Sequence, residues 1–545
     1  MRNHFRTPRV VACLMAIAGL LSVAQAQGNI RPGTNVSLST LGGIGSPTGS
    51  RNGTFPTGTQ SWGVSTTSCN VGTVGVPWLA RMNIDHPSIG MFMYREYEGR
   101  FEQISLFRGV KHGFTSTNSG GCTPSCPGGA GTSLVIGCSD TYGASLNYSH
   151  SWMAPPSEID PWTGIWTSVG SHFDRGYPPV SGAQATDNVL SPINFPSGNQ
   201  GYRNLVYDSA LNVTGATFWV AGYYNVIGEP DANRENNFAT RTFTRIWGGT
   251  TWSFSVSGTQ YPTPAIYRWT GATVNSASNG NNDGRFYVAV KVTGPSAGLY
   301  HYEFAVFNRD NARQGGQVRI PVCSGASVSN LWFGDPDDVA GNDWTATLTP
   351  TEIVFTAPAG DTNNLTWGNL FNFAFDSDAA PATANVNVDE ALAGAGLASV
   401  AVASSCPMDL RNVYLGAGCG TPSAPTLGAN GPALLGNATF ALSSANVGAG
   451  SSNFFVMSLL DTVLPVGGGC TIYVDPAAVF FGDGATANGS GVATLPIPIP
   501  IDPALNSATL TVQAVEFQLP SGSFGNLDLT NGLKIKLGTG NPGCN

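Results

Sequence analysis

The sequence is poor in charge and has no long helical pattern. Charged residues make up 10% of its 545 residues, against about 25% in an average soluble protein, so few ion-paired helices can form. The 24 lysines and arginines are outnumbered by 33 acidic residues. This excludes the broad basic surface that nucleic acid requires. The 70 glycines follow no three-residue period, which excludes collagen.

What the chain does contain is typical of β structure. Apolar residues make up 41% and aromatic residues 10% of the chain, which argues against disorder. The length allows roughly three or four domains. Segments such as Ala216–Tyr224 and Thr250–Val256 show the two-residue alternation of strands. We therefore predict an all-β protein of several β-sandwich domains with long loops rich in Gly, Pro and Asn.

The first 26 residues have the features of an export signal. Three arginines precede the apolar segment Val10–Val23, and an Ala-x-Ala cleavage site ends at Ala26. We expect cleavage before Gln27, and we expect no membrane span after it, because no later segment is long and apolar enough. The protein is thus predicted to be secreted, with the cell surface as an alternative. Without the three arginines of the signal the net charge changes from −9 to −12, which disfavours adsorption to anionic membranes.

Ten cysteines are present, and Cys13 leaves with the signal. In an exported protein the other nine are expected to form disulfides, and an odd number leaves at least one thiol outside an intramolecular pair. Four of them lie close together: Cys69, Cys122, Cys126 and Cys138. We predict two bridges among these four. The loop between the middle two is too short for a comfortable bridge, so both are expected to pair outward.

Composition divides the chain into segments. Residues 27–68, rich in Gly, Ser and Thr, are predicted to be a flexible N-terminal arm. Residues 69–283 are predicted to form a β domain rich in cysteine and aromatic residues. Residues 284–405 are predicted to form an immunoglobulin-like β-sandwich, with the alanine-rich stretch 379–405 leading out of it.

Residues 420–545 are predicted to form a further β-sandwich module. Its run Pro496–Pro503 cannot be a central strand, because proline removes the backbone donors of the ladder. An edge or a polyproline-like connector fits this run. Upstream, Gly294–Gly298 matches the nucleophile-elbow pattern of hydrolases. A strand rather than a helix follows it, so we interpret it as the turn of a β-hairpin.

Seven short segments form a recognisable set: Thr66–Gly72, His86-Pro87, Gly99–Ile104, Lys111–Phe114, Gly137–Tyr142, Asp283–Phe286 and Tyr300–Val306. In this order they resemble a group of large uncharacterised exported bacterial β-rich proteins. Pro496–Leu505 and Asn531–Leu533 are similar to a C-terminal β module attached to many secreted proteins of such bacteria. The resemblance implies shared architecture and export. It implies no activity and no catalytic residue.

Two histidines are candidates for a transition-metal site. His86 and His112 belong to the shared segments and lie near methionines and the cysteine cluster in the sequence. Imidazole together with sulfur suits copper or zinc. Their separation matches no recognised zinc motif, so the alternative of hydrogen-bonded histidines near a core stays open.

An acidic stretch in the predicted sandwich is the candidate for a calcium site. Carboxylates and carbonyls on a loop can hold this hard cation, which makes Ca²⁺ a candidate cofactor. The alternative is a solvated polar loop. The acidic residues concerned are Asp335, Asp337, Asp338 and Asp343.

Aromatic and acidic side chains of residues 69–283 leave two classes of function open. Aromatic side chains in loop-rich segments either stack on sugar rings or pack under the loops: Trp152, Trp162, Trp166, Tyr177, Tyr202 and Tyr207. Two carboxylates that face a cleft can hydrolyse a glycoside, and these acids are available: Glu96, Glu98, Glu102, Asp140, Glu158 and Asp160.

The sequence therefore predicts a secreted or cell-surface protein with a binding or structural role, directed at polysaccharide or other cell-surface components. This hypothesis rests on export, β architecture, aromatic-rich loops and the lack of a recognisable catalytic set. The alternative is a secreted enzyme with its site in residues 69–283. Such an enzyme would be a carbohydrate-active hydrolase or lyase, or a metal-dependent oxidase.

Overall fold

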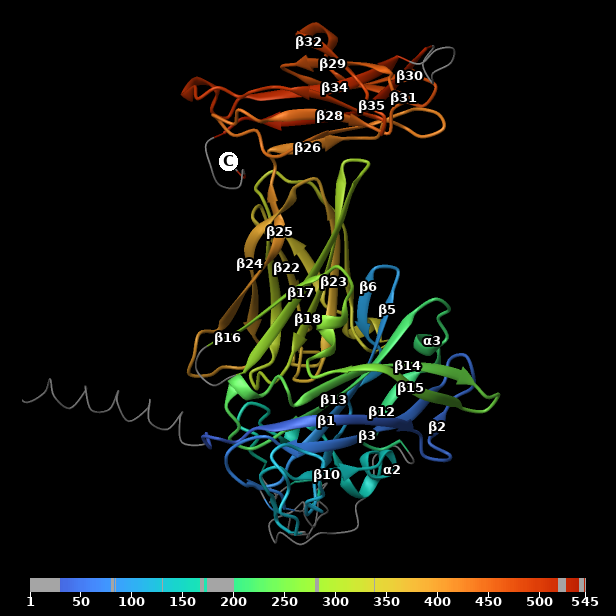
Figure 1. Ribbon diagram of the computed structural model, residues 1–545, viewed down its shortest axis with the longest axis vertical. Helices are drawn as coiled ribbons and strands as arrows, with labels where there is room; N and C mark the ends of the chain where they lie inside the picture. The colour runs from blue at the N-terminus through green and yellow to red at the C-terminus, as the bar shows by residue number, and fades with distance from the viewer. Residues whose placement is uncertain are drawn as a thin grey trace, which may run out of the picture.

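The computed structural model describes residues 30–79, 83, 85–129, 131–166, 171–173, 200–279, 284–337, 339–517, 526–538 and 544. The export signal predicted for residues 1–26 lies outside these ranges, as do Tyr177 and Asp338. Antiparallel sheets make up the structure, which confirms the all-β prediction. Figure 1 shows three bodies stacked along the long axis: an N-terminal body (residues 30–268), a central sandwich (273–409) and a C-terminal module (412–538).

The N-terminal body has two main sheets that face each other across a core containing Trp62, Met91 and Val220. One sheet consists of β1 (Val36–Gly45), β2 (Arg51–Asn52), β3 (Thr59–Asn70), β7 (Ser105–Leu106), β10 (Ser139–Tyr142) and β12 (Asn204–Tyr207). The other consists of β5 (Ser88–Tyr97), β6 (Arg100–Gln103), β8 (Val110–His112), β11 (Met153–Ala154), β13 (Thr217–Asn225), β14 (Phe238–Trp247) and β15 (Trp252–Tyr261). A small sheet and two short helices complete it: β4 (Val76–Pro77), β9 (Ser133–Leu134), α2 (Ala144–Asn147) and α3 (Asp208–Leu211).

The described part of residues 27–68 is not a flexible arm. β3 pairs with β1, β2, β10 and β12, and the side chains of Val36, Leu38 and Trp62 are fully or almost fully buried. The prediction was wrong because small residues separate the few large apolar ones. Threonine is favoured in strands although it is not apolar, so the low apolar content hid two long strands.

The central sandwich packs two five-stranded sheets around a core that includes Phe304, Trp344 and Phe373. The first sheet has the order β16 (Thr273–Ser278), β17 (Arg285–Ser296), β18 (Leu299–Asn308), β23 (Leu370–Ser377), β20 (Val328–Gly334). The second has the order β21 (Thr345–Leu348), β22 (Glu352–Thr356), β19 (Gly315–Pro321), β24 (Ala380–Glu390), β25 (Ser399–Asp409). β17 and β18 form the predicted hairpin.

Two predicted borders of the central sandwich are wrong. β16 pairs with β17, so the sandwich begins before residue 284. Residues 379–405 do not lead out of it, because β24 and β25 pair along most of their length and bury Val386 and Val402 completely. Small and β-branched side chains alternate along these strands. The high alanine content concealed this alternation in the sequence.

The C-terminal module packs a five-stranded sheet against a three-stranded one. The larger sheet has the order β26 (Asn412–Leu415), β35 (Leu527–Lys536), β34 (Thr509–Phe517), β29 (Ser452–Ser458), β32 (Val479–Thr486). The smaller has the order β27 (Thr426–Ala429), β28 (Ala441–Ala445), β33 (Val492–Pro496), and β30 (Asp461–Gly467) pairs with β31 (Cys470–Val474). β33 ends at Pro496 and no strand follows until β34, so the proline-rich run is the connector that the sequence predicts.

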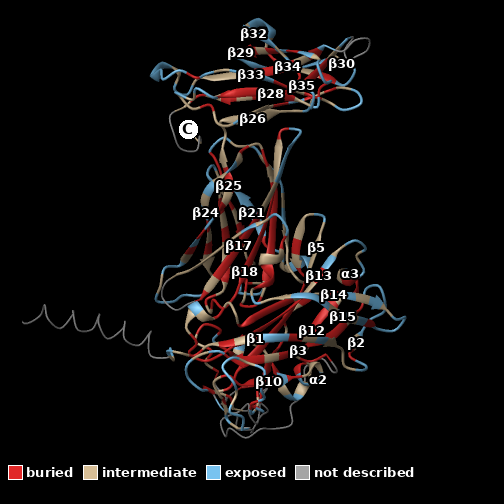
Figure 2. Cartoon of the chain, viewed as in Figure 1, coloured by how far each residue is buried: buried red, intermediate tan, exposed pale blue. Residues whose placement is uncertain are grey.

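The N-terminal body and the central sandwich share one core. Phe92 lies 6.5 Å from Phe307 and Phe107 lies 5.0 Å from Trp367, measured between ring centroids. Figure 2 shows buried strands on both sides of this junction. Residues 69–283 and 284–405 are therefore not separate globular units, because cutting between them would expose aromatic side chains of both.

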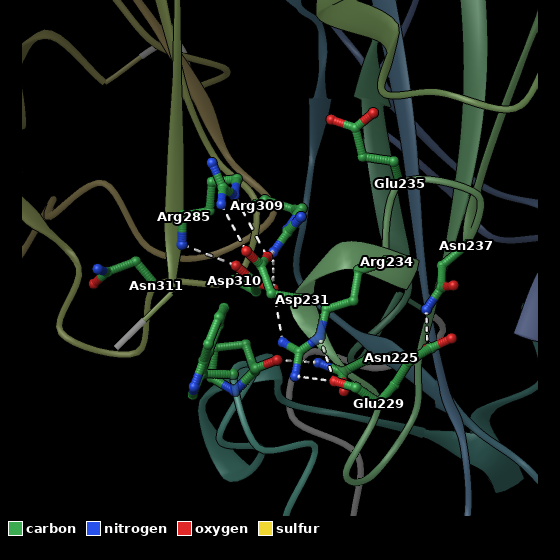
Figure 3. Close-up of polar contacts among 12 residues, drawn as sticks. Asn225, Glu229, Asp231, Arg234, Glu235, Asn237, Arg285, Arg309, Asp310 and Asn311 are labelled. Atoms are coloured by element: carbon green, nitrogen blue, oxygen red, sulfur yellow. Dashed lines mark hydrogen bonds and ion pairs between the residues drawn. The ribbon is translucent and has the colours of Figure 1, made fainter. Parts of the chain in front are cut away.

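Charged side chains also cross this junction (Figure 3). Arg285 and Arg309 of the central sandwich contact Asp231 of the N-terminal body. In the opposite sense, Arg234 reaches Asp310 at 2.8 Å, and Arg309 also contacts Asp310 at 2.9 Å. Arg309, Asp310 and Arg234 are buried, so each charge depends on its partners across the junction.

Four disulfides connect the described chain. Cys69 pairs with Cys122 and Cys126 with Cys138, in the outward arrangement that the short central spacing predicts. Two further bridges are Cys419–Cys470 and Cys323–Cys544. Among the described cysteines the unpaired thiol is that of Cys406, where burial raises the pKa to about 12. No helix of the described residues is long and apolar enough to cross a membrane.

Candidate functional site

A cleft of about 560 Å³ lies where loops of the N-terminal body face loops of the central sandwich. β12 pairs with both β3 and β7, with Leu205 opposite Leu106. This pairing brings Tyr207, at the end of β12, close to Phe107 and Arg108, which follow β7. These three residues form one wall of the cleft.

The opposite wall is polar and comes from the central sandwich. It contains Asp335 and Asp337, which follow β20, and the segment 361–364, which precedes β23. The side chain of Asn364 donates to Asp361 Oδ1 at 3.0 Å, and that of Asn363 donates to Asp335 Oδ2 at 2.6 Å. The two loops are thus tied together before any ligand arrives, which lowers the entropic cost of binding.

The predicted calcium ligands form an internally bonded loop. Asp335 Oδ1 accepts from the backbone N–H of Asp337 at 3.0 Å. Asp337 in turn accepts from the N–H of Val339 at 2.8 Å and from the side chain of Asn342 at 3.2 Å. Within the described ranges no group of three or more His, Cys, Asp or Glu residues could hold a metal. The carboxylates of Asp335 and Asp337 are thus already occupied by donors of the protein, and the described residues do not form the predicted site.

The pKa of Asp335 is shifted toward neutral pH. Burial raises its pKa to about 6, and nearby Asp337 and Asp343 add to the increase, while the hydrogen bond from Asn363 opposes it. A carboxyl with this pKa is partly protonated in mildly acidic solution and can either donate or accept a hydrogen bond. In the cleft it is a group suited to hydroxyl ligands.

The wall from the N-terminal body combines aromatic surface with a cation. Phe107 packs edge-on against Trp367, and the backbone N–H groups of Arg108 and Gly109 donate to the side chain of Asn204 at 3.0 and 3.1 Å. Burial lowers the pKa of Arg108, although Tyr207 and Tyr202 act against this. Tyr207 itself is half-buried, so part of its ring faces the cleft.

The structure brings His86 and His112 together, but not as a metal site. His112 lies opposite Ser88 in the ladder, and its Nδ1 is 2.5 Å from Nε2 of His86. A metal held by both nitrogens needs about 2.0–2.1 Å to each at a tetrahedral angle, and that requires a wider separation. Nδ1 of His86 also contacts the carbonyl of Asn83. Burial lowers the pKa of His86 to about 4, with a contribution from Lys111. The pair therefore belongs to the core.

Lys111 is a buried ionisable residue that sequence reasoning missed. Its ammonium nitrogen lies 3.0 Å from the centroid of the Tyr142 ring and 4.5 Å from that of Phe114. Burial holds its pKa well below the usual range, although Asp140 opposes the shift. Its place between Val110 and His112 in β8 was compatible with an outward-facing lysine, so the sequence carried no signal for its burial.

The other predicted aromatic residues lie away from the cleft. Trp162 and Trp166 are 8% and 2% exposed, Trp152 packs on Phe114 at 4.5 Å, and Tyr202 packs on His172 at 4.7 Å. Among the described aromatic candidates, Tyr207 is the residue that lines the cleft. Packing under the loops thus accounts for most of this set.

The predicted carboxylates also serve separate structural contacts. Glu102 accepts from Arg95 at 2.7 Å, and Asp140 accepts from the indole N–H of Trp78 at 2.9 Å. Asp160 accepts from two backbone N–H groups of its own turn. Burial raises the pKa of Glu158 to about 7, and this carboxylate accepts from the N–H of His172 at 2.7 Å. None of these carboxylates lines the described cleft.

Comparison with known proteins adds little. No protein-family model and no curated protein matches the chain. Among solved structures, it is similar to Escherichia coli alpha-2-macroglobulin activated by porcine elastase, at 9% identity over 92% of this chain and 35% of that chain, with a TM-score of 0.14. Salmonella alpha-2-macroglobulin reacted with methylamine gives 8% identity, 94% and 38% coverage and a TM-score of 0.16. The chain spans little more than a third of the length of these proteins.

Proposed function

We propose that this chain is an exported β-sandwich protein that binds polysaccharide, or the sugar part of a cell-surface component, in the cleft between the N-terminal body and the central sandwich. The observation that carries the proposal is the lining of the cleft. Tyr207 supplies a partly exposed aromatic ring, and the opposite wall supplies carboxyl and amide groups that can hydrogen-bond hydroxyls. Four disulfides support export, because such bridges persist in oxidising compartments.

The geometry of the cleft supports recognition of a ligand with many hydroxyl groups. Most pockets for apolar molecules have few polar groups, whereas this wall contains three aspartates and several asparagines. The loops that carry them are fixed by hydrogen bonds such as that from Asn363 to the carbonyl of Asn342 at 3.0 Å. A sugar ring can stack one face on the aromatic ring, while the hydroxyl groups at its edges form hydrogen bonds with the rigid polar wall.

Calorimetric titration of the full chain with a panel of neutral, acidic and amino-sugar oligosaccharides tests the proposal. We expect at least one class to bind, and Tyr207→Ala to weaken that binding at least tenfold, because the stacked ring is lost. Tyr97→Ala is the matched control, since Tyr97 ends β5 and does not line the cleft. The proposal fails if no oligosaccharide binds, or if both variants bind alike.

Hydrolysis of the bound sugar is a second candidate function, favoured by the raised pKa of Asp335 in the cleft. A carboxyl that is half protonated near pH 6 can act as a general acid. Its location moves the candidate catalytic group from residues 69–283 to the central sandwich. Release of reducing ends by the full chain, abolished in Asp335→Asn with binding retained, would establish this function. Binding without turnover would leave the protein a lectin-like binder.

A further inference from the structure

The C-terminal module contains an apolar pocket that the proposed sugar cleft does not involve. Its volume is about 120 Å³, and eleven residues line it, every one of them apolar. Leu442 comes from β28, Met457 from β29 and Ile535 from β35. The pocket therefore lies between the two sheets of the module, among residues of its main core.

One side of the pocket is the proline-rich connector. Ile497, Pro498, Ile499 and Pro500 all line it. The N–H of Ile497 donates to the carbonyl of Phe440 at 2.8 Å, and that of Ile499 donates to the carbonyl of Asn437 at 3.0 Å. These bonds hold the connector against the segment that leads into β28, so the pocket keeps its shape without a ligand.

The same bonds leave this side of the pocket without a free backbone donor. Both isoleucine N–H groups are used, and Pro498 and Pro500 have no N–H. A peptide that adds to a sheet needs backbone donors and acceptors at the edge it joins. Residues 497–500 offer no such donor, so an extended peptide is a poor ligand here. What remains is contact with hydrocarbon.

The volume sets the size of the group that fits. An apolar cavity of about 150 Å³ stays dry and accepts benzene, so a pocket of about 120 Å³ holds roughly five or six carbon atoms. Apolar surface continues outside, because Pro498 and Pro500 are exposed and Ile501 is 85% exposed. A ligand longer than the pocket can therefore extend along the connector toward water.

We propose that this pocket binds the methyl end of an aliphatic acyl chain and leaves the polar end of the ligand in solvent. Such a site would give the C-terminal module an anchoring role separate from the sugar cleft. The N-terminal body lies at the opposite end of the molecule in Figure 1, so both sites could be occupied at once.

Ligand-observed NMR titration of the full chain with sodium butanoate, hexanoate, octanoate and decanoate tests the chemistry. Each buried methylene is expected to raise the affinity about fourfold until the pocket is full. We therefore expect a steep rise from butanoate to hexanoate and a much smaller one from octanoate to decanoate. Absence of binding, or an affinity independent of chain length, would overturn the proposal.

Two variants locate the binding. Leu505 is half-buried and lines the pocket. Leu505→Trp replaces this side chain by a larger, aromatic one and should reduce octanoate affinity at least tenfold. Leu459→Trp is the matched control, because Leu459 lies in the same module at 62% exposure and outside the pocket. Met457→Ala enlarges the pocket and should move the plateau to a longer acid, which keeps the test decisive if Leu505→Trp does not fold. Octanoate binding unchanged in both pocket variants would place it elsewhere and refute the site.

Flotation with phosphatidylcholine vesicles separates the two sources of this chemistry. Co-flotation of the parent chain and Leu459→Trp, but not of Leu505→Trp, would assign the pocket to membrane lipid. Octanoate binding without flotation would assign it to free fatty acids. Failure of both assays would refute the acyl-chain site and leave the sugar cleft untouched.

Discussion

The two junctions of this molecule are built on different principles. The N-terminal body meets the central sandwich through a shared aromatic core and a buried set of ion pairs around Asp231, Arg309 and Asp310. The central sandwich meets the C-terminal module through a short connection, a ring contact of 6.3 Å between Tyr300 and Tyr414, and a disulfide. The first junction is continuous with the folding core, whereas the second is a limited contact.

This difference explains where each proposed site lies. The sugar cleft is formed by both partners of the first junction, so its two walls keep a fixed separation. The acyl pocket lies inside one module and depends on no junction. A site formed between two bodies needs a rigid junction. The buried ion pairs supply it, because a shift of one body against the other would leave buried charges without their partners.

The largest effect is expected from Asp310→Ala. This carboxylate is fully buried and accepts from Arg234, from Arg309 and from the backbone N–H of Arg285. Removing it leaves two buried guanidinium groups without that partner, which should cost about 3–5 kcal/mol. Urea unfolding of the full chain should show this loss in the transition of the N-terminal body and central sandwich. Asp461→Ala, which removes an exposed ion pair with Lys534, should change stability by less than about 1 kcal/mol.

Loss of the paired bridges within residues 69–138 should have the next largest effect. Two of the four disulfides lie there, and removal of a disulfide from a small domain costs about 2–5 kcal/mol. Cys126→Ser with Cys138→Ser should therefore lower the melting temperature of the N-terminal body. Dithiothreitol should act mainly in the same place. A melting curve that reductant leaves unchanged would contradict this expectation.

A smaller and more local effect is expected at the second junction. Cys323→Ser with Cys544→Ser removes the covalent link between the central sandwich and the end of the chain. Because the modules keep separate cores, we expect the melting temperatures to stay within a few degrees. Limited proteolysis near residues 409–412 should become faster. If the cysteine double variant lost as much stability as Asp310→Ala, the proposed difference between the two junctions would be wrong.

The smallest effect is a pH dependence at the rim of the first junction. Partial burial alone would lower the pKa of His301, but hydrogen bonds with Glu303 and Asp376 outweigh it and raise the pKa. Glu303 also binds Arg100 of the N-terminal body. The stabilisation is fully present below the unfolded pKa near 6.5 and is lost as pH rises through the higher folded pKa. Because the side chain is 43% exposed, we expect about 0.5–1 kcal/mol at most. His301→Gln should flatten this part of the stability profile.

Several features could be predicted from the sequence because they are local. Alternation in β13 and β15 and the hairpin between β17 and β18 were visible as two-residue patterns. The outward pairing of Cys122 and Cys126 followed from a short loop. The connector after Pro496 followed from the missing N–H groups of proline. By contrast, β3 and β24 were missed because small residues carry their alternation.

The candidate sites were less accessible to sequence reasoning. His86 and His112 were predicted as metal ligands, and the structure places their rings in direct contact. A contact between two rings and a metal site use the same residue types, so the sequence could not distinguish them. Asp335 was predicted as a calcium ligand and Tyr207 as an aromatic residue that stacks on sugar or packs under a loop. Only the fold places them in one cleft, across 128 positions of the chain.

The sequence by itself determined the class of the protein. Low charge, abundant β-branched and aromatic residues and clustered cysteines led to a disulfide-linked all-β chain, and the export signal remains a prediction from residues 1–26. The tertiary structure decided which bodies are fused, which acids share a loop and where the apolar pocket opens. The reason is physical: strand alternation and turn chemistry depend on residues a few positions apart, whereas clefts and buried ion pairs depend on strand order and on charges that meet only after the chain has folded.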